Sequence, residues 1–272
     1  MSERKYVMFL DILGFSQLVS NNTPDQLKQI YNSEIHQTAG MCTLLSASIF
    51  KSAHDFKILA KETGELSDVH QTSINFHVLS DSLIAWTNDT TFESLKNICQ
   101  YAATYLSMTL SLGLPHRGAI SVGDIQLIEL PLNGSLQSNV VGSGIVNAHN
   151  LEVGQEWMGC VVDQDCLKEL SKEEIHELFR GDPVVLQCKP PFKETAKHRS
   201  NLAVNWTLFD TPLKNDREFF EEQFSRHNKG SSDSSNIKIQ NTYEFYCKHT
   251  QINNHEANKS KQSDAETAGG YV

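Results

Sequence analysis

Long apolar runs are missing from this sequence. A membrane-spanning helix needs about 18 or more consecutive apolar residues, and no stretch approaches that length. The apolar stretch Tyr6–Leu10 is short and ends at Asp11, so it does not have the form of a secretory leader. We therefore expect a cytoplasmic protein that does not act at a membrane.

Positive charge is also scarce. Lys and Arg number 23 against 33 Asp and Glu, which gives a formal net charge of −10. This balance argues against a protein whose main task is to bind nucleic acid or an anionic membrane. If the chain handles phosphate groups, it must obtain positive charge locally, from a metal ion or from a few placed basic residues.

Two groups of common motifs are absent as well. The six cysteines show no C-x-x-C spacing, which fits a reduced protein without a disulfide framework. No Gly-Lys-Ser/Thr of the phosphate-loop type occurs, and Gly142-x-Gly144 lacks the third glycine of a dinucleotide-binding turn. Hydrophobic residues make up 39% of the chain, which is enough for a sizeable core.

Helical and strand-like patterns intermix along the chain, which indicates an α+β or α/β fold. The run 74–86 is interrupted by Ser80-Asp81-Ser82, so it is two strands joined by a tight turn or one interrupted strand. Asn133-Gly134 predicts a hairpin. The expected helices cover residues 24–46, 92–112, 145–153 and 172–179, and the expected strands cover residues 5–10, 74–86, 116–128, 160–162, 184–188 and 203–208.

The character of the sequence changes beyond Pro212. We expect a catalytic domain over 1–212, a helical arm over 213–252 with a flexible linker at 229–236, and a disordered polar tail over 253–272. The arm carries several aromatic residues, which are expected to pack it on the body or on another protomer.

Two aspartates stand at the ends of apolar runs. Asp11 follows "VMFL", Asp81 follows "FHVLS", and a turn comes directly after each. If the strands are neighbours in one sheet, the carboxylates form a hard oxygen site for Mg²⁺ or Mn²⁺. Alternatively, both aspartates are turn and capping residues. A phosphatase-type nucleophile is disfavoured, because such enzymes usually carry a second aspartate two residues on, where this chain has Leu13.

Four segments in order change this balance: "FLDILGF", "LSDSLIAW", "RGAISVG" and "VGSGIVNAHNLE". Together, over roughly residues 6 to 153, they resemble the catalytic domain of class III nucleotide cyclases. Within that superfamily the chain looks closest to the Pycsar uridylate and cytidylate cyclases of bacterial anti-phage defence. The resemblance implies an α+β, ferredoxin-like or palm-type domain, with a mixed, mostly antiparallel sheet flanked by helices.

The resemblance also assigns roles to the first two segments. Asp11 and Asp81 become the ligands of two divalent metal ions, Mn²⁺ or Mg²⁺, with the carbonyl of Ile12 as an auxiliary ligand. The turn that follows would embrace the triphosphate, because Gly14 lets backbone amides approach phosphate closely and the next helix begins there. The expected phosphate-turn residues are Ile12, Leu13, Gly14 and Phe15.

Other positions depart from the purine-cyclase pattern. His77 stands where those enzymes keep a base-reading lysine, and Asn139 where adenylate cyclases keep a base-reading aspartate. Val146 and Asn150 replace the asparagine and arginine that steady the transition state. Arg117 is a candidate to replace the missing cation. Taken singly, His77 and Asn139 are equally well explained as satisfied structural residues, and Arg117 also has a structural alternative.

Residues of a second protomer would complete each site, because the resemblance implies a twofold symmetric homodimer. Phe50 could stack on the base and Lys51 could meet a phosphate, although an ordinary solvated segment is the simpler interpretation.

The resulting hypothesis is a phosphorus-oxygen lyase that converts a pyrimidine nucleoside triphosphate, UTP in preference to CTP, to the 3′,5′-cyclic monophosphate and pyrophosphate. The product would be a second messenger that activates a downstream effector in antiviral defence. The alternatives are a purine (adenylate or guanylate) cyclase and a non-catalytic, cyclase-like nucleotide-binding protein.

Overall fold

The computed structural model of the chain describes residues 4–46, 74–132, 135–208, 217–230 and 232–268. Phe50 and Lys51 lie outside these residues. No helix in the described part of the chain is both long and apolar enough to cross a membrane.

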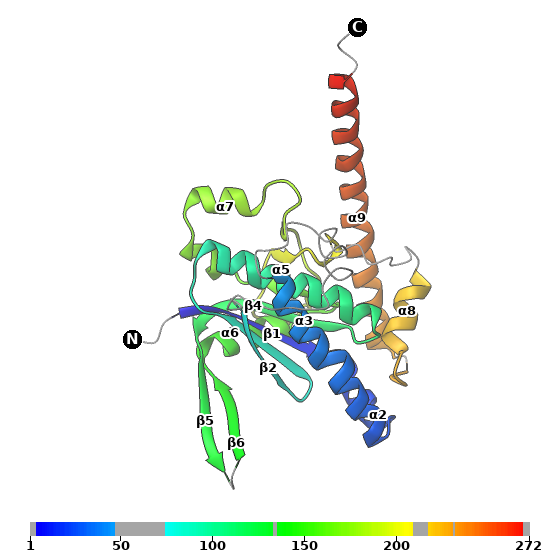
Figure 1. Cartoon of the computed structure of the whole chain (residues 1–272). Coiled ribbons are helices and arrows are strands. Elements are labelled where there is room, and N and C mark those ends of the chain that lie inside the picture. Colours follow the sequence, from blue (N-terminus) through cyan, green and yellow to red (C-terminus); the bar gives the residue numbers. More distant parts are fainter. Residues whose placement is uncertain (1–3, 47–73, 133–134, 209–216, 231, 269–272) are drawn as a thin grey trace, which may run out of the picture.

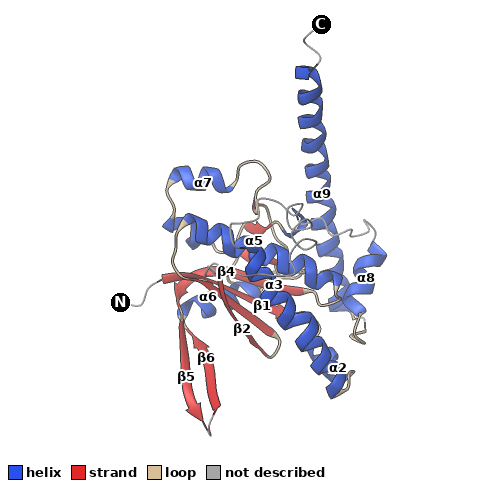
Figure 2. Cartoon of the chain, viewed as in Figure 1, coloured by secondary structure: helices blue, strands red, loops and turns tan. Residues whose placement is uncertain are grey.

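The centre of the molecule is a seven-stranded sheet in the order β2-β3-β1-β4-β7-β9-β8. Only β4 and β7 pair in parallel, and the other neighbours run antiparallel. The predicted α+β class, with a mixed and mostly antiparallel sheet flanked by helices, is therefore confirmed (Figure 2). The strands are β1 (Arg4–Ile12), β2 (Ile74–Leu79), β3 (Ser82–Thr87), β4 (His116–Asp124), β7 (Gly159–Val162), β8 (Val185–Gln187) and β9 (Leu202–Val204).

Strand alternation decides which side chains of β1 reach each face of the sheet. Tyr6, Met8 and Leu10 are fully buried in the main core, beneath α3 (Gln37–Ser46) and α5 (Phe92–Ser111). The intervening residues face the other side, where α6 (Ser143–Glu152) packs on β1 and β4 (Figure 1). By this alternation Asp11 lies on the α6 face, at the end of a central strand.

The helices follow the sequence pattern closely. The predicted helix 24–46 is present as α2 (Pro24–Gln29), a π-helix (Ile30–His36) and α3. The remaining helices are α1 (Phe15–Ser20), α7 (Lys172–Leu178), α8 (Arg217–Ser225) and α9 (Asp233–Ala268), with 3₁₀ turns at Gln164–Glu169 and Trp206–Leu208.

The expected strand 116–128 is wrong in its extent. The chain leaves the main sheet after Asp124, and β5 (Gln126–Leu132) pairs with β6 (Ser135–Val141) as a separate two-stranded ribbon that projects from the body (Figure 1). The backbone bends because Ile125 is buried beside β1 and β3, and because Asp124 bonds to Ser143 at the start of α6. Asn133-Gly134 lies outside the described residues, but its flanking strands pair in register.

Two further expectations need correction. The strand expected at 203–208 ends at Val204 and continues as a 3₁₀ turn. The segment expected to be a linker carries Lys229, which is only 1% exposed, and α9 begins within it at Asp233. The polar composition of residues 229–236 hid the second feature, because composition does not reveal a single side chain that inserts into the body. The predicted division at 212 and 252 stays a prediction, and α9 runs across the second boundary.

Candidate active site

The two aspartates expected to act together lie side by side. β3 follows Asp81 and pairs with β1, so that Asp11 stands opposite Ser82 in the ladder. The Ile12 amide donates to the Asp81 carbonyl at 3.0 Å. The Asp81 carboxyl lies close enough to the Asp11 carboxyl to help raise its pKa. The interrupted run 74–86 therefore forms two strands whose turn delivers Asp81 to Asp11.

A residue outside the sequence prediction supports that turn. Ser80 has a φ of 55°, a left-handed conformation that is uncommon outside glycine. The Tyr31 hydroxyl donates to the Ser80 carbonyl at 2.8 Å, from the π-helix that interrupts the first long helix. Tyr31 lies within the predicted helix 24–46, and the helical pattern gave no signal of a polar contact across the molecule.

The surroundings of Asp11 are rich in negative charge. The pKa of Asp11 is raised to about 7, mainly by burial and also by the nearby Glu152 and Asp81, against the opposing effect of Arg117. A divalent cation placed between two such carboxylates would relieve their repulsion. The donor set therefore fits the expected metal.

The protein supplies only part of a coordination sphere. Among the described residues no three His, Cys, Asp or Glu side chains converge to bind an ion. Two carboxylates with one backbone carbonyl leave open positions, which suits Mg²⁺ or Mn²⁺ ions that also bind substrate phosphates and water. The Ile12 side chain is a hydrocarbon packed in the interior, so the backbone carbonyl is its one group that could bind a metal.

Arg117 is engaged within the protein. It stands opposite Asp11 on β4, its Nε donates to Glu152 at 2.6 Å, and one terminal nitrogen donates to the Gln155 carbonyl at 2.8 Å. Its side chain is 12% exposed and that of Glu152 is 2% exposed. The guanidinium thus anchors α6 to β4, which is the structural alternative for this residue. Its expected catalytic role stays a prediction.

His149, to which the sequence assigned no role, lies beside Glu152. Its imidazole packs edge-on against Phe9 at 5.2 Å between ring centroids, and its Nδ1 lies 3.4 Å from the Glu152 carboxylate. Asn150 is half-buried in the last turn of the same helix. The helix therefore presents polar groups on the Asp11 side of the sheet.

The turn after Asp11 has the backbone shape that a phosphate turn requires. Gly14 has a φ of 81° and caps α1, whereas Leu13 is buried in the core and Phe15 is half-buried. Leu13 and Phe15 therefore contribute packing, and open backbone is concentrated at Gly14. The α1 helix has six residues, which is too short for a strong helix dipole, so the expected attraction of its N-terminus for anions is weak.

His77 lines a cavity beside the ribbon. The cavity has a volume of about 320 Å³, and its polar lining includes His77, Asn75 and Ser138 around Trp86. Asn139 pairs with Ile128 on β5 and, by strand alternation, faces away from Ser138. The two expected base-reading residues of one protomer are therefore not brought together in this cavity.

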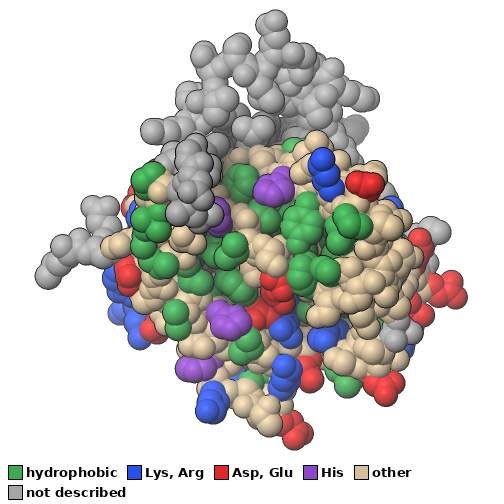
Figure 3. Space-filling model, turned by 90° about the horizontal axis from the view of Figure 1, so that it is seen from below, with side chains coloured by type: hydrophobic (Ala, Val, Ile, Leu, Met, Phe, Trp, Pro, Cys, Tyr) green, Lys and Arg blue, Asp and Glu red, His purple; other side chains and the backbone are tan. Residues whose placement is uncertain are grey.

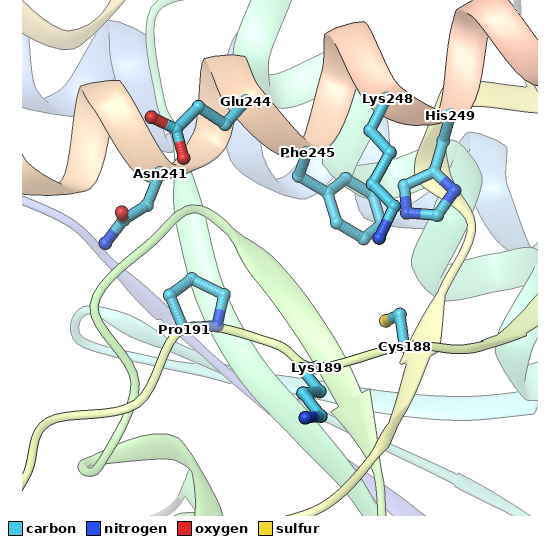
Figure 4. A pocket seen from close by; sticks show the side chains of 8 residues that line it. All are labelled: Cys188, Lys189, Pro191, Asn241, Glu244, Phe245, Lys248 and His249. Carbon is cyan, nitrogen blue, oxygen red and sulfur yellow. The ribbon is translucent and has the colours of Figure 1, made fainter.

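A second cavity lies far from these residues in the fold, between α9 and the segment after β8. It has a volume of about 220 Å³. Figure 4 shows Lys248, Phe245 and His249 projecting from α9 toward Cys188 and Pro191. None of the predicted site residues lines it.

The ribbon and α6 carry an exposed apolar surface. Seen from the ribbon side, hydrophobic side chains are spread around a small acidic group (Figure 3). Large apolar side chains that are at least 39% exposed on these elements are Leu127, Ile128, Leu130, Val141 and Val146. Leu127 and Ile128 lie on opposite faces of the ribbon by strand alternation, so both faces of it expose apolar side chains. Exposed apolar surface commonly marks protein interfaces.

No family model and no curated protein matches the chain. Solved structures resemble it. A guanylyl cyclase domain of the RhoGC fusion protein from Blastocladiella emersonii, described as a non-canonical dimer, is 16% identical, with 61% of this chain and 82% of that chain covered and a TM-score of 0.39. The guanylate cyclase domain of RhGC from Catenaria anguillulae with GTP is 13% identical, covers 75% and 97%, and has a TM-score of 0.46.

The adenylyl cyclase CyaB from P. aeruginosa is similar at 13% identity, with 75% of this chain and 95% of that chain covered and a TM-score of 0.41. With identities of at most 16% and TM-scores of at most 0.46 among these three, the similarity carries no information on substrate or activity.

Proposed function

We propose that the chain is a nucleotidyl cyclase, and specifically one that uses a pyrimidine nucleoside triphosphate. The observation that carries the proposal is the placement of Asp11 at the end of β1 beside Asp81 in the turn before β3, where the Ile12 amide bonds to the Asp81 carbonyl and the Gly14 turn follows. The ordered motifs that contain these residues support the same activity. UTP is favoured over CTP.

In the proposed reaction, the ribose 3′-hydroxyl loses its proton to solvent, and its oxygen attacks the α-phosphorus in line. The new P–O bond closes the cyclic phosphodiester while the bond to pyrophosphate breaks. Divalent ions would supply Lewis-acid stabilisation of the phosphates. Asp11, Asp81 and the Ile12 carbonyl would hold them, and the Gly14 turn would orient the triphosphate. The protein's main contribution is thus positioning.

Base selection would involve His77 and its cavity. A histidine offers a short, flat donor or acceptor where a lysine offers a long cation, and the cavity residues Asn75 and Ser138 add hydrogen-bonding groups. Asn139 faces the other side of the ribbon, so it would act toward a second protomer. The apolar ribbon supports the proposed homodimer. The proposed role in antiviral defence, through an effector that reads the product, rests on the motif resemblance.

The decisive experiment incubates the pure protein with ATP, GTP, CTP and UTP separately, in the presence of Mn²⁺, and separates the products by HPLC. We expect cyclic UMP and pyrophosphate from UTP, and no product from Asp11→Ala or Asp81→Ala. Asp182→Ala, which changes an exposed aspartate elsewhere, is the matched control and should retain activity.

Two other results of this experiment would each support a different function. Cyclic AMP or cyclic GMP as the main product would replace the pyrimidine assignment by a purine cyclase. Nucleotide binding without any product would support a non-catalytic protein, for which Val146 and Asn150 at the transition-state positions are the sequence argument.

A further inference from the structure

The Gly14 turn has few visible sources of positive charge. The short helix α1 contains no basic residue in its last turn and offers little dipole, and Arg117 is paired with Glu152. A triphosphate carries several negative charges, and metal ions neutralise only some of them. Another cation close to the turn would therefore matter to the proposed function, on which this inference rests.

Lys229 lies directly behind this turn. A methyl group added at Gly14 would come within 3.2 Å of the Lys229 Cδ, so the lysine stem packs against the turn. Its Nζ donates to the Gly113 carbonyl at 2.7 Å. Two residues on, the Pro115 carbonyl accepts from the Leu13 amide at 2.9 Å. Lys229 thus touches the turn and the loop that holds it.

Folding stability does not explain why a charged residue, Lys229, is buried behind the Gly14 turn. Lys229 is 1% exposed, and none of the ion pairs in the described part of the chain includes it. Burying an ammonium group with one carbonyl partner is costly, and burial lowers the pKa of Lys229 to about 7. An apolar side chain of similar length would fill the same space at lower cost.

The end of α5 does not require this lysine either. Arg226 donates to the Ser111 carbonyl at 3.2 Å, and His227 bonds to the Leu112 carbonyl at 2.7 Å. These neighbours already provide cationic or polar partners for the carbonyls at the end of that helix. What distinguishes Lys229 is its contact with Gly14.

We propose that Lys229 is a positioning residue for the triphosphate, which fixes the Gly14 turn and, in its protonated form, places a weakly screened positive charge behind it. A charge in a buried setting acts over a longer distance than a solvated one. The segment that joins α8 to α9 would then contribute to substrate binding although it lies more than 200 residues from Asp11 in the sequence.

The test uses the full chain with Lys229→Met, which keeps an unbranched stem and removes the charge. His227→Gln is the matched control, because it alters the same segment without touching Gly14. Three quantities are measured for each: the melting temperature, the dissociation constant of inorganic tripolyphosphate with Mg²⁺ by calorimetry, and KM and kcat for UTP.

We expect Lys229→Met to raise the tripolyphosphate dissociation constant and KM about tenfold, with a smaller change in kcat. His227→Gln should lower the melting temperature and leave the dissociation constant unchanged. Unaltered tripolyphosphate binding by Lys229→Met, or equal weakening by His227→Gln, would overturn the proposal. If Lys229→Met does not fold, Lys229→Gln, which keeps a donor toward Gly113, replaces it with the same expected result.

The binding measurement separates this proposal from the proposed function. A wild-type protein that binds tripolyphosphate but cyclises no nucleotide would contradict the cyclase assignment, and the effect of Lys229→Met on that binding would still decide the role of Lys229.

Discussion

The Tyr31 hydroxyl donates a hydrogen bond to the carbonyl of Ser80, the residue immediately before Asp81. This contact joins the π-helix to a turn in a left-handed conformation. Strained turns persist where the surrounding structure holds them in place, and such positions cluster at functional sites. Asp81 is thus positioned by a side chain that belongs to neither of its flanking strands.

Tyr31→Phe should therefore lower kcat strongly and lower the free energy of unfolding only slightly. Removing one hydrogen bond costs about 1 kcal/mol of folding free energy, whereas a displaced Asp81 would lower cyclase turnover about tenfold or more. Turnover of UTP and the melting temperature are measured together. A loss of turnover only in proportion to the unfolded fraction would contradict the positioning role.

Asp11→Asn should abolish activity and stabilise the metal-free protein. Burial and the neighbouring carboxylates raise the pKa of Asp11 from 3.8 to about 7, so the free-energy cost of ionising it in the folded chain builds up between these two pH values and is complete above pH 7. We expect a gain on the order of 1 kcal/mol at pH 8, allowing for partial solvent screening. Urea denaturation at pH 8 and pH 5 measures it, and an equal gain at both pH values would argue against the electrostatic cause.

Glu152→Gln should destabilise the protein strongly. Its carboxylate is almost fully buried against Arg117, and breaking a buried ion pair from one side costs about 3–5 kcal/mol. The exposed pair between Arg4 and Glu169 provides the control, because Glu169→Gln should cost about 1 kcal/mol or less. Chemical denaturation of both variants tests the difference, and similar losses would mean that Arg117 finds another partner.

Stability should rise with pH above neutrality because of Lys229. Its pKa is about 7 in the folded chain, against 10.5 as the ordinary value, so the unfolded state binds more protons between these limits. The free energy of unfolding should therefore increase from pH 7 to pH 9, by on the order of 1–3 kcal/mol. Lys229→Met should lack this increase. If the free energy of unfolding changed with pH in the same way for both proteins between pH 7 and pH 9, Lys229 would not be the cause of the increase.

Periodicity predicted most of the fold. The buried alternation of β1 and the long apolar face of α5 are local patterns, and both elements lie where the sequence placed them. The exit of the chain at Ile125 was missed because a strand pattern continues across it, while the bend depends on Ser143 and Gly142 far along the chain. Local patterns carry no record of such contacts.

In the candidate site too, local patterns identified some residues and missed those that depend on distant contacts. Asp11 and Asp81 stood out because each ends an apolar run, and the four ordered motifs favoured a metal site over turn and capping roles. The sheet brings the two residues together. Tyr31, Glu152 and Lys229 received no functional role because each acts through a partner remote in sequence. Phe50 and Lys51 lie outside the described residues, so the predictions for them stand as before.

The ribbon β5–β6 begins where β4 ends and finishes where α6 starts. Those two elements carry Arg117 and Glu152, whose ion pair joins the start of β4 to the end of α6. β4 and α6 are therefore tied together twice, by Asp124 and Ser143 at the ribbon and by Arg117 and Glu152 at their other ends, near Asp11. Because both ends of the ribbon are fixed within the body, a change in its length need not move Arg117 or Glu152.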